Sequence, residues 1–146
     1  LKSYDIIPLL FISLTIIAGT FVSGMDAGLV YNTFPYMGES IIPIEYGNLG
    51  FIDPFENPVT AQFHHRLLAS ITLIIIIIYS ILYIIRNSIN LRILLLLFAI
   101  VCQFIIGIFT LLYSVPITLG AMHQFGGVLL FLSALWLLHS PKKNTF

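Results

Sequence analysis

Charged residues are missing from three long stretches of this chain. No Asp, Glu, Lys or Arg occurs from 6 to 25, from 67 to 85 or from 93 to 138. A helix needs about 20 apolar residues to cross the hydrocarbon core of a bilayer. The third stretch is too long for one crossing, and Pro116 lies near its middle, where a proline favours a break. We therefore predict four membrane-spanning helices, near 5–25, 60–85, 91–113 and 117–139.

The overall composition supports a membrane protein. Hydrophobic residues make up 59% of the 146 residues and charged residues 8%, whereas soluble domains carry about 25% charged residues. The expected fold is an all-α, polytopic four-helix transmembrane bundle in one domain, 1–146. The first apolar segment exceeds the apolar core of a signal peptide, which is about 7–15 residues long, so we read it as a span. Because the chain begins with Leu1, we expect a fragment or a processed product.

Charge predicts the direction of the spans and excludes some partners. With four crossings both termini lie on one side, and that side receives most of the bases: Lys2, Arg86, Arg92, Lys142 and Lys143. The other side receives most of the acids: Asp26, Glu39, Glu45, Asp53 and Glu56. Arg66 and Asp5 depart from this sorting. The positive-inside rule then places the termini in the cytoplasm or matrix, and the long loop 26–59 in the periplasm or intermembrane space. We expect the inner membrane of a bacterium or a mitochondrion, with lipid as a partner. The zero net charge gives no reason to expect nucleic acid.

Two histidines interrupt the apolar pattern at matching positions. His65 and His123 lie in the first turns of the second and fourth predicted helices, which run in the same direction, so both should lie at one depth near the loop 26–59. Imidazole inside a membrane is costly unless it is paired, hydrated or bound to a ligand. His65 shares its helix face with small Ala69, whereas His64 points about 100° away, so we expect His65 to face inward.

Small or polar residues also form stripes at helical spacing on the other helices. The stripe through His123 contains Pro116, Gly120, Gly127, Leu130 and Ala134. Helix three offers Gln103, Gly107, Thr110 and Ser114. Helix one offers Ser13, Ile17, Thr20 and Gly24. Glycine-mediated helix packing explains such stripes as well as a ligand site does. We expect these faces to point into the bundle.

Three chemistries suit the histidine pair. Zinc is disfavoured because no third or fourth ligand lies at that depth. A proton relay remains open. Axial ligation of a haem iron by both histidines fits best, because a bundle core supplies two ligands and space. Arg66 then suits a haem propionate, or it reaches lipid headgroups. We expect His139 to be a solvated terminal residue, and the single Cys102 to be a small buried hydrophobe without a disulfide partner.

Three segments resemble the haem A synthase family. They are Phe21–Met37 with its Asp-Ala-Gly and Tyr-Asn-Thr-Phe-Pro sequences, Asn57–Ala69 with Gln-Phe-His-His-Arg, and Gly107–Gly127 with Met-His-Gln. The likeness runs from about Thr20 to His139. Family members contain two similar four-helix halves, and this chain resembles the second half. The resemblance implies haem b held between His65 and His123, and it gives His64 no role.

The resemblance also implies a reaction and partners. The family oxidises a methyl group of haem O to the formyl group of haem A, for cytochrome oxidase assembly. Haem O is thought to bind the first half, which carries its own histidine pair and a glutamate. The implied partners are haem O, the missing N-terminal half and haem O synthase. Two alternatives stay open: a non-enzymatic bis-histidine membrane cytochrome module, and a haem-free assembly protein. We expect no conversion of haem O by this chain alone, and its catalytic residues stay unassigned.

Overall fold

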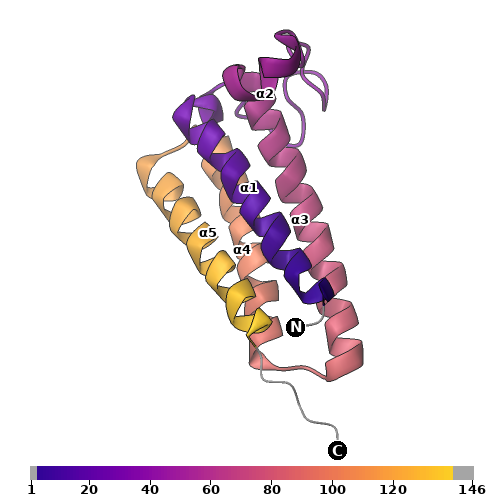
Figure 1. The fold of residues 1–146 in the computed structure, drawn as a ribbon. Coiled ribbons are helices and arrows are strands. Elements are labelled where there is room, and N and C mark those ends of the chain that lie inside the picture. The colour runs from indigo at the N-terminus through magenta and orange to yellow at the C-terminus, as the bar shows by residue number, and fades with distance from the viewer. Residues whose placement is uncertain (1–2, 140–146) are drawn as a thin grey trace, which may run out of the picture.

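Four long helices stand side by side in the computed structural model, which describes residues 3–139 (Figure 1). They are α1 (Ile7–Gly24), α3 (Pro58–Asn87), α4 (Leu91–Leu112) and α5 (Ile117–Leu138). Each of the four is long and apolar enough to cross a membrane. Residues 3–139 contain no β-strand. The predicted all-α membrane bundle is therefore confirmed.

Local sequence signals explain where the helices begin. The side chain of Asn57 accepts a hydrogen bond from the backbone N–H of Val59 at 3.0 Å, and Pro58 occupies the first position of α3, where a missing N–H costs nothing. The side chain of Asn90 caps α4 in the same way, from the backbone N–H groups of Arg92 and Ile93. The cap at Asn57 starts α3 two residues before the predicted position.

The predicted break at Pro116 separates α4 from α5. Ser114 and Val115 both adopt positive φ angles, 57° and 54°, which reverse the chain direction within a short turn. The backbone N–H of Val115 donates to the carbonyl of Thr110 at 2.8 Å and closes that turn. Gly28 lies directly over the turn, where an added Cβ would come 2.8 Å from Val115 Cγ2. The long loop is therefore packed against the α4–α5 turn.

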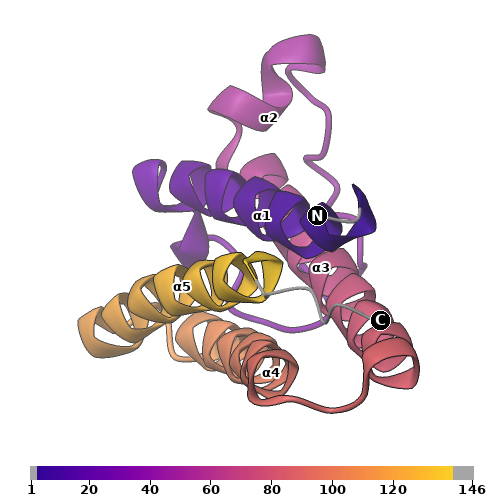
Figure 2. The ribbon, with the colours of Figure 1, turned by 60° about the horizontal axis from the view of Figure 1, so that its bottom comes forward.

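The helices associate as two pairs, α1 with α3 and α4 with α5 (Figure 2). The buried apolar cluster lies mainly toward the end of the bundle where α3 connects to α4. Its members are Ile12, Ile76, Ile93, Leu96, Ile100, Leu130, Ala134 and Leu137. The opposite half of the bundle contains histidine, glutamine and glycine between the helices instead. The core thus holds the bundle at one end and leaves the other end for polar groups.

The loop between α1 and α3 contains η2 (Ala27–Leu29), η3 (Gly50–Ile52) and α2 (Asp53–Glu56). The Asp53 carboxylate, 1% exposed, accepts hydrogen bonds from the backbone N–H groups of Gly47 and Leu49, each at 2.9 Å, and from the side chains of Asn57 and Thr60. Burial alone would raise the pKa of Asp53, but these hydrogen bonds together hold it below its ordinary value. One carboxylate therefore ties this part of the loop to the start of α3.

The stripe predicted to line the inside of α1 is wrong, because Ile17, Thr20 and Gly24 are exposed. The inward face of α1 carries Pro8, Ile12, Thr15 and Gly19 instead. Thr20 satisfies its hydroxyl on its own helix, at the carbonyl of Ile17, so it needs no interior partner.

The charged side chains lie at the two ends of the bundle. Arg86 and Arg92 flank the α3–α4 connection, and Glu39, Glu45 and Asp53 belong to the segment between α1 and α3. This segment and the α3–α4 connection lie at opposite ends of the bundle (Figure 1). The bases Lys2, Lys142 and Lys143, which also entered the topology prediction, lie outside the described residues. The side of the membrane that each end faces stays a prediction.

Candidate functional site

The imidazole rings of His65 and His123 face each other inside the bundle. Their centroids are 6.3 Å apart and their planes are inclined by 83°. His65 lies about 10 Å below the start of α3, and His123 lies about 9 Å below the start of α5, at a rise of about 1.5 Å per residue. The structure thus brings together the two histidines that the sequence places at one depth.

A glycine on the neighbouring helix accommodates each ring. A Cβ added to Gly19 of α1 would lie 3.1 Å from Cε1 of His65. A Cβ added to Gly107 of α4 would lie 2.8 Å from Cε1 of His123. Carbon atoms in contact normally lie about 3.5–4.0 Å apart. Neither position therefore has room for a side chain while the ring keeps its place.

The hydrogen bond of His65 determines which ring nitrogen carries the proton. Nδ1 of His65 lies 3.1 Å from the backbone carbonyl oxygen of Thr15, and a carbonyl only accepts. Nδ1–H is therefore the donor, and Nε2 keeps the lone pair that a metal requires. The hydroxyl of Thr15 also lies 2.7 Å from that of Thr72, about two turns beyond His65, and this contact ties α1 to α3.

His123 has a side-chain partner, Gln103 of α4. The amide nitrogen Nε2 of Gln103 donates to the backbone carbonyl of His123 at 2.7 Å and lies 3.2 Å from Nδ1 of the same residue. The amide oxygen Oε1 is buried and has no hydrogen-bond partner within residues 3–139. Sequence reasoning placed Gln103 on an inward stripe but did not connect it to His123. The two belong to different helices, so no local spacing links them.

Arg66 reaches the loop rather than open space. Its guanidinium donates to the carbonyl oxygens of Tyr31 at 2.6 Å and Thr33 at 2.9 Å. One turn earlier on α3, Gln62 also donates to the carbonyl of Tyr31, at 3.0 Å. Nε of Arg66 is buried and without a hydrogen-bond partner in the described part of the chain. Sequence reasoning did not foresee this anchoring, which fixes part of the loop directly beside His65.

The remaining histidines lie away from the pair. Nε2 of His64 is 3.2 Å from the hydroxyl of Tyr46 in the loop, and the two rings meet edge to face at 5.6 Å. Nδ1 of His139 lies 2.9 Å from the carbonyl of Leu135 at the end of α5. Within residues 3–139, His65 and His123 are therefore the histidines whose rings face one another.

Residues 1–135, which include this histidine pair, match the model of the COX15-CtaA family, described as cytochrome oxidase assembly protein. The chain belongs to this family. The match covers all four long helices except the last residues of α5. The family resemblance that the sequence motifs indicated is therefore confirmed, and the match extends over nearly the whole chain.

Curated relatives in the COX15-CtaA family are named haem A synthase. The chain is 38% identical to that of Wolbachia pipientis wMel over 149 residues, which cover 99% of this chain and 41% of the relative. It is 40% identical to that of Rickettsia bellii, with 97% and 43% covered. It is 41% identical to haem A synthase COX15 of Mus musculus, with 89% and 33% covered. The chain thus spans between a third and a half of the length of these relatives. No solved structure matches the chain.

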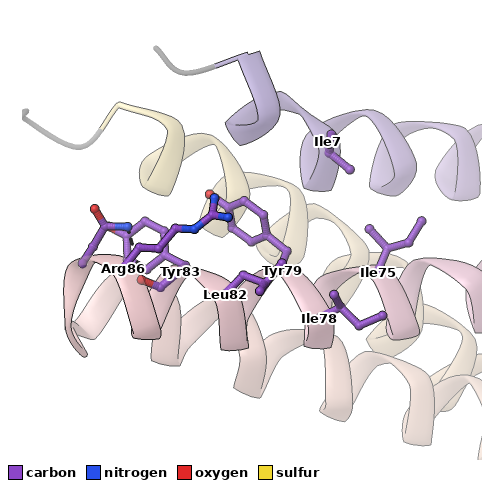
Figure 3. Close-up of a pocket in the computed structure, with 8 residues that line it drawn as sticks. Ile7, Ile75, Ile78, Tyr79, Leu82, Tyr83 and Arg86 are labelled. Carbon is purple, nitrogen blue, oxygen red and sulfur yellow. Dashed lines mark hydrogen bonds between the residues drawn. The ribbon is translucent and has the colours of Figure 1, made fainter.

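A separate cavity of about 280 Å³ lies at the other end of the bundle, between the start of α1 and the second half of α3 (Figure 3). Ile7, Ile75 and Ile78 line its apolar part, and Arg86 lies at its polar end. Tyr83 is 18 residues beyond His65, about 27 Å along α3. This cavity is therefore not part of the histidine site.

Proposed function

We propose that this chain is the second, haem-b-binding half of a haem A synthase, with His65 and His123 as the axial ligands of the iron. The parent activity would be oxidation of the haem O methyl group to the formyl group of haem A in cytochrome oxidase assembly. Membership of the COX15-CtaA family and the names of the relatives support this proposal. The close approach of the two histidine rings, at 6.3 Å between centroids, is the observation that carries the ligand assignment.

The spacing of the rings fits two ligands on one metal ion. A bond between a metal ion and an imidazole nitrogen is about 2 Å long. Each ring nitrogen lies about 1 Å from its centroid, so two opposed axial imidazoles have centroids about 6 Å apart. The observed separation is 6.3 Å. Packed aromatic rings also meet with centroids about 4.5 to 7 Å apart, so the separation agrees with ligation and the names of the relatives favour that interpretation over packing alone.

The surroundings of the pair also suit a bulky cofactor. Gly19 and Gly107 keep the rings close to the helix backbones of α1 and α4. Small residues let a flat group approach a helix closely.

Arg66 would act on the carboxylate end of the cofactor. Its buried Nε–H lacks a hydrogen-bond partner in residues 3–139, and a buried unpaired donor is unfavourable by about 1–3 kcal/mol. A propionate would satisfy it with a charge-assisted hydrogen bond. Because Arg66 also binds the carbonyls of Tyr31 and Thr33, the loop would be fixed in place over the cofactor.

The role we assign to this half is electron transfer or structural support for the reacting haem. Haem b held here would supply one-electron redox chemistry. His65 and His123 would orient it, and the helices around them would exclude water from it. Intramembrane carboxylates are absent from α1, α4 and α5, and α3 has none between Pro58 and Asn87. The residues of the oxidation itself are therefore not assigned to this chain.

The ligand assignment is tested by absorption spectroscopy of purified protein loaded with haem b. The wild type should show a low-spin, six-coordinate spectrum, and His65→Ala and His123→Ala should each lose it. His64→Ala is the matched control, because the imidazole of His64 contacts Tyr46 in the loop and not His123. This variant should keep the spectrum. Retention of the spectrum in both single variants, or its loss in His64→Ala alone, would contradict the assignment.

The enzymatic reading is tested with haem O. When the chain is expressed alone with a source of haem O, chromatography of extracted haems should show haem b and no haem A. The reason is that a reacting group must be held within about 1 Å of its place, and residues 3–139 bring one histidine pair together. Appearance of haem A would place the catalytic site in this chain. If addition of an N-terminal half of a relative does not restore conversion, the non-enzymatic cytochrome module becomes the better reading.

A further inference from the structure

Gln103 is the side chain from another helix that contacts His123 through a hydrogen bond. It lies on α4, one turn before Gly107, and its amide extends across to α5. We infer that Gln103 is the positioning residue that sets which nitrogen of His123 is free to bind the iron. This inference rests on the proposed haem site and goes beyond it, because ligation by both histidines does not say how the protonated nitrogen of each one is determined.

The two histidines differ in what faces their Nδ1 atoms. His65 meets the carbonyl of Thr15, which accepts, so its Nε2 already has a free lone pair. His123 meets the amide nitrogen of Gln103, which only donates, so in this arrangement Nδ1 of His123 is the acceptor. The proton of a neutral imidazole then sits on Nε2, the atom that would bind the metal. His65 is therefore ready for ligation and His123 is not.

One rotation of the Gln103 amide removes this obstacle. The terminal torsion of glutamine is broad and roughly two-fold, so turning the amide by about 180° exchanges its oxygen and nitrogen. Oε1 is buried and has no hydrogen-bond partner within residues 3–139. After the turn it would accept a hydrogen bond from Nδ1–H of His123, and Nε2 of His123 would be free. The amide would give up its 2.7 Å hydrogen bond to the backbone carbonyl of His123 and would have to move away from that oxygen. Binding of the metal by His123 and reversal of the Gln103 amide are thus coupled.

Two glycines of α5 make room for this amide. A Cβ added at Gly126 would overlap Oε1 of Gln103, whereas a Cβ added at Gly127 would lie 3.5 Å from Nε2, an ordinary contact. Alanine at the first position therefore displaces the amide, and alanine at the second leaves it in place. Gly126→Ala and Gly127→Ala are therefore matched variants at neighbouring positions of one helix.

Substitutions of Gln103 should shift the reduction potential of bound haem b in opposite directions. A hydrogen-bond acceptor at Nδ1–H makes the imidazole a stronger ligand, and loss of such a partner typically weakens metal binding by about 10–100-fold. Gln103→Leu should therefore raise the potential and weaken binding. Gln103→Glu keeps the size of the side chain and supplies a stronger acceptor, so it should lower the potential. A purely structural role predicts shifts of one sign, or none.

The experiment is a redox titration of haem-loaded wild type, Gln103→Leu and Gln103→Glu, with Gly126→Ala and Gly127→Ala alongside. Opposite shifts in the two Gln103 variants, with Gly126→Ala resembling Gln103→Leu and Gly127→Ala resembling the wild type, support the inference. Unchanged potentials overturn it while leaving the haem site intact. Should Gln103→Leu fail to fold, Gln103→Glu alone decides, because an unchanged potential there also overturns it. A wild type without a two-histidine spectrum defeats the proposed function first.

Discussion

The contact between Gly107 and His123 allows one methyl group to test the geometry of the site. A Cβ added at Gly107 would lie 2.8 Å from Cε1 of His123. Carbon atoms in contact need about 3.5–4.0 Å, so the ring or the helix must retreat by about 1 Å. Overpacking of this kind costs about 1–3 kcal/mol. Gly→Ala inside a helix is otherwise favourable by about 1 kcal/mol, which offsets part of that cost.

A second glycine separates the clash from the gain in helix stability. Gly120 of α5 would place its new Cβ 3.8 Å from Val115 Cγ1, an ordinary contact. Gly120→Ala should therefore gain up to about 1 kcal/mol, and Gly107→Ala should end about 1–3 kcal/mol below it, because the helix term cancels between them. Thermal unfolding of the two variants in the same detergent, without haem, measures this difference.

Haem binding gives an independent reading of the same displacement. Because His123 would move by about 1 Å, Gly107→Ala should also bind haem b more weakly than Gly120→Ala does, with loss of six-coordinate absorption. Equal unfolding midpoints and equal haem affinities for Gly107→Ala and Gly120→Ala would refute the close approach of α4 to His123. Lower stability with unchanged haem binding would show that α4 moves and the ring stays.

Three further predictions concern the loop and its side of the membrane. The pKa of Asp53 lies below its ordinary value, so its carboxylate stabilises the loop fully above the unfolded pKa of about 4, and this stabilisation is lost as the pH falls toward the lowered folded pKa. Proteolysis of the loop should therefore increase in acid. A rate of proteolysis that does not change between pH 3 and 7 would contradict this prediction. The hydrogen bond from Tyr31 to Glu45, then burial and the Glu45 charge, raises the pKa of Tyr31. The protonated phenol should therefore stabilise the loop below a pH of about 10, and this stabilisation should be lost as the pH rises through the raised pKa. Titration of Tyr31 at its ordinary pKa, followed by ultraviolet absorbance, would count against this prediction. A cysteine at Ser40 should react with an impermeant thiol reagent on intact cells or mitoplasts, and one at Asn87 should not; the reverse pattern would invert the topology.

The positions of the membrane-spanning helices and the shared depth of the two histidines could be predicted from the sequence. Span length, the break at Pro116 and the shared depth of His65 and His123 depend on hydropathy and on counting crossings, which are properties of short segments. The structure confirms four long apolar helices and brings the two rings to 6.3 Å. The sequence also predicted the inward face of α5, because glycine and alanine recur along it.

The rotation of α1 about its own axis could not be predicted in this way. Its residues are apolar or small on every side, so hydropathy does not distinguish the face that meets α3 from the face that meets lipid. The sequence suggested Ile17 and Thr20 for the interior, whereas Thr15 and Gly19 lie there. Packing against the imidazole of His65 decides the rotation, since Gly19 is the residue without a Cβ at that level.

What the sequence by itself determined is therefore the set of membrane-length helices, their break and the depth of the histidines. Only the tertiary structure decided that Gln103 contacts His123, that Thr15 contacts His65, and that Arg66 binds loop carbonyls. The physical reason lies in the range of the interactions. Hydrophobic length and helix breaking act within a segment, whereas the partner of a buried polar group is whichever group the packed helices bring within hydrogen-bond distance, however far away it lies in the chain.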